Sequence, residues 1–386
     1  MNRIINLGMH PYADTFISID QLEFTEPVYP LECCLNPLNG LVHLKYKTSP
    51  NERYNLYDYS YTSSNSDYSK KYWQNYFLNI SDKLKLKSNS NILEIGSNDG
   101  YLLSKFKKSG HKILGVDSSE YMSNLANKNN IETINDIFDL NFSKKIPEKF
   151  DLVIANNVLN HSNDPKNFLL GVKELLKEKG DFVFEVPYWF DTIRDGRFDQ
   201  IYHEHVSYFT IFSAVNILKE VGLYVYDVEQ TEYHGGSIRV YSSTNKTILN
   251  SKLKELIKKE VKYGLFENKF YKKYQELIDK KRSETLIKIH KLKSQNKKII
   301  AVGAAAKGNT YLNYYGLNNT IIDFVTDSSE FKIGKFTPLT RIPILSDEEV
   351  FSLYSEEVYV LILSWNISEI IKSKLKGIYN NIIYIN

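Results

Sequence analysis

The sequence is poor in cysteine and lacks long apolar runs. Its 386 residues include only two Cys, the adjacent Cys33 and Cys34. Two neighbouring thiols exclude the disulfide framework of a small secreted domain and indicate a reducing compartment. No apolar run comes close to the roughly 18 residues that a membrane helix needs, and the opening "MNRIINLGMHPYADTF" lacks the apolar core of a secretory leader. We therefore expect a cytoplasmic protein with no membrane partner.

An excess of charge of one sign is also missing. The formal net charge is +3, and the basic residues are spread along the chain instead of forming a block. Nucleic-acid binding needs a concentrated basic surface, so we expect no nucleic-acid partner. The hydrophobic content of 42% is typical of globular proteins. A chain of this length predicts two or three domains.

The apolar pattern predicts an α/β protein with four consecutive regions. Residues 1–75 are expected to form a small, irregular N-terminal domain. Residues 76–245 alternate short apolar strands with amphipathic helices, which is typical of a doubly wound sheet. Residues 246–294 are dense in Lys and Glu at helical spacing and predict one or two linking helices. Residues 295–386 begin with strand, glycine turn and helix, which predicts a second Rossmann-like domain.

A glycine turn in the central region predicts a cofactor site. In "LEIGSNDGYLL", Gly96 and Gly100 let a ligand approach the backbone at the start of a helix. Asp117 ends the next strand, at the spacing where a carboxylate meets a ribose hydroxyl. Glu94 within the strand and the G-S-N-D-G spacing favour S-adenosylmethionine (SAM) over NAD; a turn without ligand is the alternative. With S-adenosylhomocysteine as the product, the predicted cofactor contacts are Glu94, Gly96, Asn98, Gly100, Asp117, Asp136, Ile137 and Asn156.

The stretch "YHEH", Tyr202 to His205, holds two of the eight His of the chain around a carboxylate. It follows the fifth predicted strand of the central region, and "NHSNDP", with His161, follows the fourth. Ligands of open α/β sheets bind beyond the carboxyl ends of the strands, so both stretches should line one cavity with the glycine turn. A two-His metal site is an alternative, but no third ligand is evident and we expect no metal. A structural role for each His is a second alternative.

In their order, the motifs of this chain resemble those of the nucleotide-sugar C-methyltransferases of deoxysugar biosynthesis. The match runs nearly end to end, through "LGMHPYADTF", "YSYTSS", "EIGSNDGYLL", "ANNVLNH", "YHEHVSYF", "HGGSIRVY" and "GAAAKGNTYLNYYG". The resemblance implies a zinc-binding N-terminal domain, a central class I SAM-methyltransferase fold of Rossmann type and a C-terminal α/β domain. It also implies methylation at carbon 3 of a 4-keto-deoxysugar linked to a nucleoside diphosphate.

Carbon 3 becomes a nucleophile only after a base removes its proton, and the enolate oxygen then needs stabilisation. Imidazole, with an ordinary pKa of about 6.5, suits the first task. By resemblance, His205 is the base, and Glu204 orients it or holds substrate. Tyr202 and His161 would contact the sugar or the enolate oxygen. The alternatives are methylation of O or N on a nucleotide-sugar or surface-polysaccharide precursor, and a non-catalytic SAM- or nucleotide-sugar-binding protein.

Further residues are expected to hold the substrate. Tyrosines would cover the site, the "HGGS" turn would supply backbone donors, and the second glycine turn, "VGAAAKGNT", would meet the diphosphate. A packing turn is the alternative for the last. Arg341 departs from the family motif and indicates either a changed nucleotide or an altered charge near it. The predicted substrate contacts are Tyr59, Tyr61, His203, His234, Gly235, Gly236, Lys307, Asn309 and Arg341.

The zinc of the family is doubtful here. The family has a C-x-x-C pair before its "GLV" motif, and this sequence has Asn36 and Asn39 at those positions. The other Cys pair has no counterpart. Neutral Asn cannot replace thiolate in a structural zinc site, so we expect the N-terminal domain to be held by packing. A monomer or weak dimer is expected.

Overall fold

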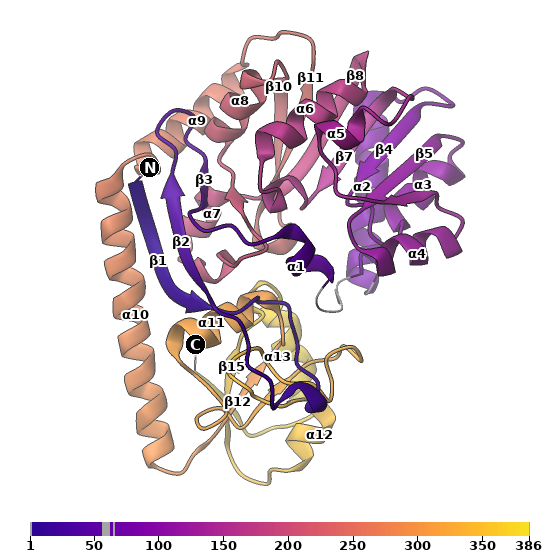
Figure 1. Cartoon of the computed structure of the whole chain (residues 1–386). Helices are drawn as coiled ribbons and strands as arrows, with labels where there is room; N and C mark the ends of the chain where they lie inside the picture. Colours follow the sequence, from indigo (N-terminus) through magenta and orange to yellow (C-terminus); the bar gives the residue numbers. More distant parts are fainter. Residues whose placement is uncertain (1, 56–61, 65, 386) are drawn as a thin grey trace.

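The structure, a computed structural model, describes residues 2–55, 62–64 and 66–385, and these ranges contain three β-sheets (Figure 1). A four-stranded sheet lies in the N-terminal region, a seven-stranded sheet in the centre and a five-stranded sheet at the C-terminal end. Figure 1 shows the central and C-terminal sheets in separate lobes, with the N-terminal strands alongside both.

The N-terminal sheet is antiparallel and has the order β1-β2-β3-β9. Its strands are β1 (Asn2–His10), β2 (Tyr29–Leu35), β3 (Val42–Leu44) and β9 (Ser207–Tyr208). This region therefore holds more regular strand than its sequence suggests. The fourth strand comes directly after the YHEH stretch, so pairing of β3 with β9 fixes that stretch to the N-terminal region. The turn η1 (Ile19–Gln21) and helix α1 (Pro50–Asn55) complete the region.

The central sheet has the order β6-β5-β4-β7-β8-β11-β10. Its strands are β4 (Asn91–Ile95), β5 (Lys112–Asp117), β6 (Thr133–Asn135), β7 (Phe150–Asn156), β8 (Leu176–Pro187), β10 (Tyr224–Thr231) and β11 (Ser237–Ser243). The first five in this order are parallel, and β11 and β10 form an antiparallel hairpin. This arrangement confirms the predicted class I methyltransferase fold. The strand order reverses at β4, and the crevice beside that reversal is where such sheets bind ligands.

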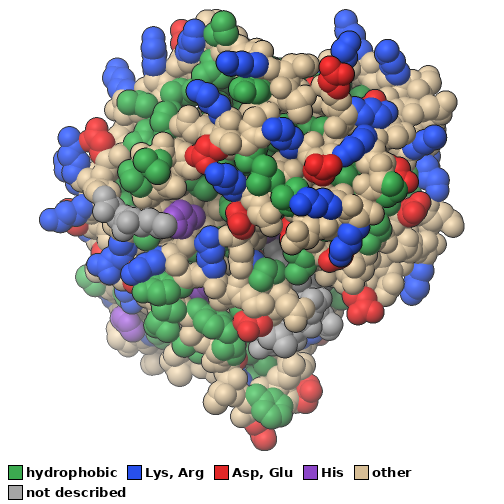
Figure 2. Space-filling view, turned by 45° about the horizontal axis from the view of Figure 1, so that its top comes forward, with side chains coloured by type: hydrophobic (Ala, Val, Ile, Leu, Met, Phe, Trp, Pro, Cys, Tyr) green, Lys and Arg blue, Asp and Glu red, His purple; other side chains and the backbone are tan. Residues whose placement is uncertain are grey.

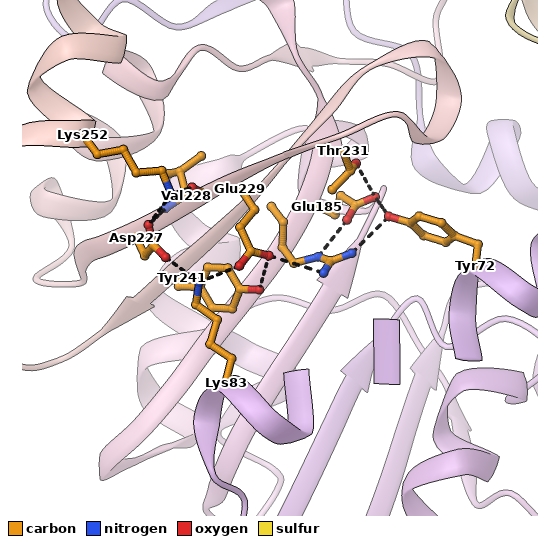
Figure 3. Close-up of polar contacts among 10 residues, drawn as sticks. Tyr72, Lys83, Glu185, Asp227, Val228, Glu229, Thr231, Tyr241 and Lys252 are labelled. Atoms are coloured by element: carbon orange, nitrogen blue, oxygen red, sulfur yellow. Dashed lines mark hydrogen bonds and ion pairs between the residues drawn. The ribbon is translucent and has the colours of Figure 1, made fainter. Parts of the chain in front are cut away.

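Helices cover both faces of the central sheet (Figure 1). They are α2 (Asp67–Leu84), α3 (Tyr101–Lys108), α4 (Glu120–Lys128), α5 (Leu140–Ser143), α6 (Pro165–Leu175) and α8 (Ile211–Glu220). Helix α7 (Trp189–Arg194) packs instead with the core of the N-terminal sheet. A polar network joins α2 to β8, β10 and β11, as Figure 3 shows. In it, Lys83 contacts Asp227 and Glu229, and Tyr72 donates to Glu185.

Two linking helices, α9 (Ser251–Tyr263) and α10 (Asn268–Ser294), lead to the C-terminal domain, as the charge pattern predicts. Glu260 is buried and accepts the amides of Ile211 and Phe212, which holds α9 against the start of α8. Figure 1 shows α10 running beside β1 from the central lobe to the C-terminal lobe. The Gln275 side chain accepts the amide of Asn6 at 2.9 Å, so α10 is joined to the N-terminal sheet.

The C-terminal sheet is parallel, with the order β14-β13-β12-β15-β16. Its strands are β12 (Lys298–Val302), β13 (Phe324–Thr326), β14 (Ile344–Leu345), β15 (Val358–Ile362) and β16 (Ile382–Tyr384). Its helices are α11 (Ala306–Tyr315), α12 (Asp347–Ser352) and α13 (Ser368–Lys376). Strand, glycine turn and helix follow one another from β12 to α11, as in the second Rossmann-like unit that the sequence predicts.

The surface in Figure 2 intersperses Lys and Arg with Asp and Glu, in line with the small net charge. On that face the charged side chains do not form a field of one sign. Within the part of the chain that the structure describes, no helix combines the length and the apolar content needed to cross a bilayer.

Candidate active site

The turn after β4 is compressed around its glycines. Gly96 has a φ of +68°, and a Cβ there would lie 2.2 Å from Cγ2 of Val158. Gly100 has a φ of +75°, and its Cβ would lie 2.8 Å from Ile131. Because both positions need a left-handed backbone and have no room for a side chain, only glycine fits them. The turn therefore exposes backbone to a ligand at the start of α3.

Asp117, at the end of β5, ties this turn to the next helix. Its two oxygens accept the amides of Asn98 at 2.8 Å and of Ser119 at 2.9 Å. Asn98 has a φ of +52°, and its side chain accepts the amide of Ser63. Burial raises the pKa of Asp117. Each carboxylate oxygen keeps a second lone pair, which suits it to accept a ribose hydroxyl.

A pocket of about 210 Å³ opens beside the turn. Gly96, Asp136, Ile137 and His161 all line it, so it brings predicted cofactor residues together with a predicted catalytic residue. Its apolar lining includes Val116, Phe138, Val158 and Phe168. An apolar wall with a carboxylate at its edge suits an adenine ring.

Two polar side chains of the glycine-turn region have buried atoms without a partner. Among the residues described, Oε2 of Glu94 and both amide atoms of Asn156 make no hydrogen bond. Burial, reinforced by the nearby Asp99, raises the pKa of Glu94 well above its ordinary value. Unpaired buried polar atoms are costly, so these atoms fit a ligand that supplies the missing hydrogen bonds. The charged amino-acid end of SAM has groups of that kind.

Tyr202 and His205 form a hydrogen-bonded pair in the YHEH stretch. The Tyr202 hydroxyl lies 2.7 Å from Nε2 of His205, and the carbonyl of Gln200 lies 3.0 Å from Nδ1. A carbonyl can only accept, so Nδ1 carries the hydrogen and Nε2 accepts from Tyr202. Burial lowers the pKa of His205 to about 3. The ring is therefore neutral, with its lone pair on Nε2.

The loops after β7 and β8 bring their histidines together, as the sequence predicts. His161 ends the turn η2 (Leu159–His161), and its ring centroid lies 5.1 Å from that of His205. Both therefore lie at the carboxyl edge of the sheet, on the two strands that follow β4 in space. His161 and His205 thus lie side by side, but of these two only His161 is among the residues that line the pocket, and a catalytic role for both stays a prediction.

Glu204 faces the N-terminal segment. Its Oε1 accepts the amide of Asp14 at 3.3 Å, and burial raises the pKa of its carboxyl to about 7. Both ring nitrogens of His205 are engaged by other groups. The orienting role expected for Glu204 therefore belongs to the Gln200 carbonyl and the Tyr202 hydroxyl, because neither ring nitrogen has a contact with the Glu204 carboxylate. A role for Glu204 in holding substrate stays a prediction.

His203 packs against the N-terminal region. Its side chain is fully buried, with ring centroids 6.0 Å from Tyr12 and 5.7 Å from Tyr29. Burial lowers its pKa to about 4. A substrate contact by His203 would require this packing to open, so the two histidines of YHEH hold different positions in the fold.

Trp365 of the C-terminal domain contacts the residues that precede YHEH. Its Nε1 donates to Asp199 at 2.6 Å, and its ring lies 4.3 Å from the guanidinium of Arg197 and 4.8 Å from Nζ of Lys307. A Cβ on Gly235 would lie 2.5 Å from the same ring. Burial raises the pKa of Asp199 to about 6 and lowers that of Lys307 to about 8. Lys307 therefore lies where the two domains meet, and a substrate contact by Lys307 stays a prediction.

Two other predicted substrate residues contact the N-terminal segment. The Asn309 amide donates to the carbonyl of Ala13 at 2.7 Å. Arg341 donates to Glu26 at 2.6 Å, and also to the carbonyls of Leu22 and Phe24. A diphosphate would have to compete with these hydrogen bonds, and nucleotide binding by these two residues stays a prediction.

The remaining predicted substrate residues are placed only in part. His234 and Gly235 lie in the turn η4 (Tyr233–Gly235), and the Gly236 carbonyl accepts the amide of Tyr188. Tyr59 and Tyr61 fall outside the described residues.

Asn36 and Asn39, at the positions of the family's zinc ligands, hold their turn by hydrogen bonds. Asn36 accepts the amide of Leu38 at 2.9 Å, and Asn39 accepts that of Leu41 at 3.1 Å. The Asn39 amide donates to Glu220 at the end of α8. In the described part of the chain, no group of three or more His, Cys, Asp and Glu side chains could hold a metal ion. The side chains that replace Cys thus shape and anchor the turn themselves.

Several residues that build the site could not be identified, or were not identified, from the sequence alone. Asp199 and Gln200 precede YHEH with only Ile201 between them, and their position near that motif was a signal for both. Trp365 follows β15, at the carboxyl edge of the second sheet, which was a weaker signal. Arg53 in α1 contacts the loops of both histidines, and nothing in the local sequence indicates this role.

Two family models match the chain in succession: a methyltransferase domain over residues 67–228 and a C-methyltransferase C-terminal domain over residues 232–383. The C-methyltransferase NovU of Streptomyces niveus is 27% identical over 383 residues, which cover 98% of this chain and 90% of NovU. The chain belongs to the SAM-dependent C-methyltransferases. The central fold and the SAM cofactor that the sequence predicts for this C-methyltransferase are thereby confirmed.

Solved structures match part of this C-methyltransferase. A SAM-dependent methyltransferase from Clostridium acetobutylicum aligns with 17% identity and a TM-score of 0.38, over 47% of this chain and 94% of its own. The magnesium protoporphyrin IX methyltransferase of Synechocystis with bound SAH aligns with 13% identity and a TM-score of 0.38, over 46% of this chain and 83% of its own.

Proposed function

We propose that this C-methyltransferase transfers the methyl group of SAM to carbon 3 of a 4-keto-deoxysugar linked to a nucleoside diphosphate. The observation that carries the proposal is the hydrogen-bonded pair of Tyr202 and the buried His205 at the carboxyl edge of the central sheet. His161 joins that pair to the pocket beside the glycine turn. Carbon methylation needs a base beside the cofactor, and this pair supplies a neutral imidazole there.

His205 has the tautomer that a base requires. The Gln200 carbonyl holds the Nδ1 hydrogen, and Nε2 keeps its lone pair. Because burial lowers the pKa of His205 to about 3, the ring is neutral at pH 7 but weakly basic in the free enzyme. A negatively charged diphosphate and the developing enolate would each raise that pKa, since nearby negative charge favours the imidazolium. Proton removal is then efficient only with substrate in place.

The Tyr202 hydroxyl has a second role in this proposal. It donates to Nε2 at 2.7 Å, so the substrate hydrogen must displace it before His205 can act. Once displaced, the hydroxyl can donate to the ketone oxygen, where the enolate charge develops. His161, whose ring centroid lies 5.1 Å from that of His205, would be the second donor to that oxygen. SAM, when bound, supplies an electrophilic methyl group, and the protein needs to place it in line with carbon 3.

The C-terminal domain is the proposed site of the nucleotide diphosphate. Lys307 lies where that domain meets Asp199 and Trp365 of the interface, and its ammonium offers a charge for a phosphate. We further propose a cytoplasmic enzyme, in line with two free thiols, acting as a monomer or weak dimer.

The test is a panel of dTDP- and GDP-linked 4-keto-6-deoxysugars incubated with enzyme in deuterium oxide. We expect solvent deuterium at carbon 3 of the true acceptor without SAM, and a new carbon–methyl bond at the same carbon with SAM. His205→Asn should slow both processes by roughly 10² or more, the contribution typical of a general base. Normal exchange in this variant would show that His205 is not the base. A methoxy or N-methyl product without exchange at carbon 3 would assign oxygen or nitrogen methylation.

A further inference from the structure

Helix α1 carries one buried arginine to the candidate active site. α1 (Pro50–Asn55) lies between the central sheet and the C-terminal domain in Figure 1. Its Arg53 is 4% exposed. Pro50 of the same helix lines the pocket beside the glycine turn. The helix thus reaches the carboxyl edge of the central sheet from the N-terminal region.

The Arg53 guanidinium contacts the loops that carry both candidate histidines. NH1 donates to the carbonyl of His203 at 3.4 Å, in the loop after β8. NH2 donates to the carbonyl of His161 at 3.3 Å and to Oδ1 of Asn163 at 2.9 Å, in the loop after β7. One side chain therefore joins two loops whose contacted residues are at least 40 positions apart in the sequence.

The partner loop is fixed to the same segment from its other side. The Asn163 side chain donates to the carbonyl of Thr48 at 2.9 Å, and Lys47 donates to the carbonyl of Asn163 at 2.6 Å. Asn163 also lines the pocket. The segment before α1 and Arg53 thus hold the loop that carries His161 and Asn163 from two sides.

We propose that Arg53 is a positioning residue that sets the relative placement of His161 and His205. The inference rests on the proposed function only for the roles of the two histidines. His205 follows His203 by two residues, and its amide donates to the Tyr202 carbonyl in the same tight turn. Movement of the His203 carbonyl would therefore move the His205 ring relative to His161. Arginine suits the task because its planar fork reaches several acceptors at fixed angles, which a lysine ammonium cannot do.

Arg53 also acts on the charge of the site. Its guanidinium favours the ionised form of Glu204, although burial and Asp14 together raise the pKa of that carboxyl to about 7. Loss of Arg53 would therefore move the titration of Glu204 further upward. This gives a pH signature in addition to the geometric one.

The variants are Arg53→Ala and Arg53→Lys, with Arg239→Lys as a matched control. Arg239 is another buried arginine that joins separate elements, since it donates to Glu185 at 3.0 Å and to Tyr72 at 3.2 Å. Its network is the one in Figure 3, outside the candidate active site. The control should lower the melting temperature while leaving kcat within about threefold of the parent.

The expected result for Arg53→Ala is a loss of roughly 10²-fold in kcat, because displacement of reacting groups by about 1 Å costs that much. The KM for the acceptor should change far less. Added guanidinium should restore part of kcat in Arg53→Ala, where it can occupy the vacated space, and not in Arg53→Lys. The pH profile of Arg53→Ala should shift upward with Glu204.

Histidine NMR separates this inference from the proposed function because it needs no substrate. In ¹⁵N-histidine spectra, Arg53→Ala should move the resonances of His161 and His205, and guanidinium should return them. His290, on α10, should stay unchanged in the same spectra. If the parent enzyme shows no exchange at carbon 3 but these shifts occur, the acceptor is wrong and the positioning role stands. Unchanged histidine resonances, or unchanged turnover in both variants, would overturn the role of Arg53.

Discussion

The turn at Gly96 and the turn at Gly303 lie at the same place in two sheets whose five parallel strands have the same order. Each follows the strand at which the order reverses, β4 in the central sheet and β12 in the C-terminal sheet. Their φ angles are +68° and +97°. The Gly96 amide donates to the carbonyl of Val116 at 2.7 Å, and the Gly303 amide donates to the carbonyl of Thr326 at 2.8 Å. In both cases the acceptor lies on the neighbouring strand.

The anchoring carboxylates match as well. Asp117 accepts the amide of Asn98 at 2.8 Å, and Asp327 accepts the amide of Ala304 at 2.8 Å. Each carboxylate also accepts the amide of the serine two positions further along, at 2.9 Å. An aspartate after the second strand is therefore first a means of holding the turn, and only second a candidate ligand group.

The surroundings of the two turns differ. Beside Gly96 the pocket opens toward Asp136 and Ile137. A Cβ on Gly303 would lie 2.2 Å from the hydroxyl of Ser364, and Lys332 donates to the Ala304 carbonyl. The protein's own side chains fill the second turn. Strand, glycine and helix thus build the same backbone in both domains, and the next loops decide whether a ligand has room.

The largest effect should come from adding one methyl group to each turn. Gly96→Ala forces a left-handed alanine against Val158, so we expect the loss of measurable SAM binding, at least about 10²-fold by calorimetry. Gly303→Ala meets Ser364 and should lower the melting temperature while SAM affinity stays within about threefold. Equal loss of SAM binding in both variants would show that the Gly96 and Gly303 turns do not differ in their role in SAM binding. A folded Gly96→Ala enzyme with normal affinity would refute the cofactor assignment.

The second prediction concerns Trp365, which follows Ser364 beside the Gly303 turn and contacts Asp199. Trp365 donates to buried Asp199, and burial raises the pKa of that carboxyl to about 6, although Lys307 and Arg197 nearby favour its ionised form. A raised pKa means that the folded state holds the proton more tightly than the unfolded state. The contribution to stability is therefore full below about pH 4 and is lost as the pH rises to about 6.

Asp199→Asn should remove that pH dependence. From about 1.4 kcal/mol per pKa unit, the difference between parent and variant in unfolding free energy should change by at most about 3 kcal/mol across the window. Urea unfolding at several pH values between about 4 and 7 measures it. Asp117→Asn, on the open side, serves as the comparison. A parent and an Asp199→Asn variant with parallel profiles would show that burial does not raise the pKa of Asp199.

The elements and the glycine turns could be predicted because they depend on local patterns. Apolar periodicity indicates strands and helices, and the rule that ligands bind at the carboxyl edge of a sheet is enough to place His161 and His205 in one site. The contacts of Arg53 and Arg341 could not be predicted, because each joins loops from distant parts of the chain. Arg341 illustrates the difference: its motif indicated a nucleotide contact, whereas tertiary packing puts Glu26 beside it. The pairing of β9 with β3 is long-range in the same way.

The smallest expected effect comes from the two matching aspartates. In Asp117→Asn or Asp327→Asn, one of the two amides would face a side-chain NH₂ instead of an oxygen. Leaving a buried amide unpaired costs about 1–3 kcal/mol, so both variants should lose similar stability in urea unfolding. Only Asp117→Asn should also weaken SAM binding, by about tenfold, since it alone lies beside the open pocket. If Asp327→Asn weakens SAM binding equally, the two turns are coupled through the interface, and the distinction between an open and a filled turn fails.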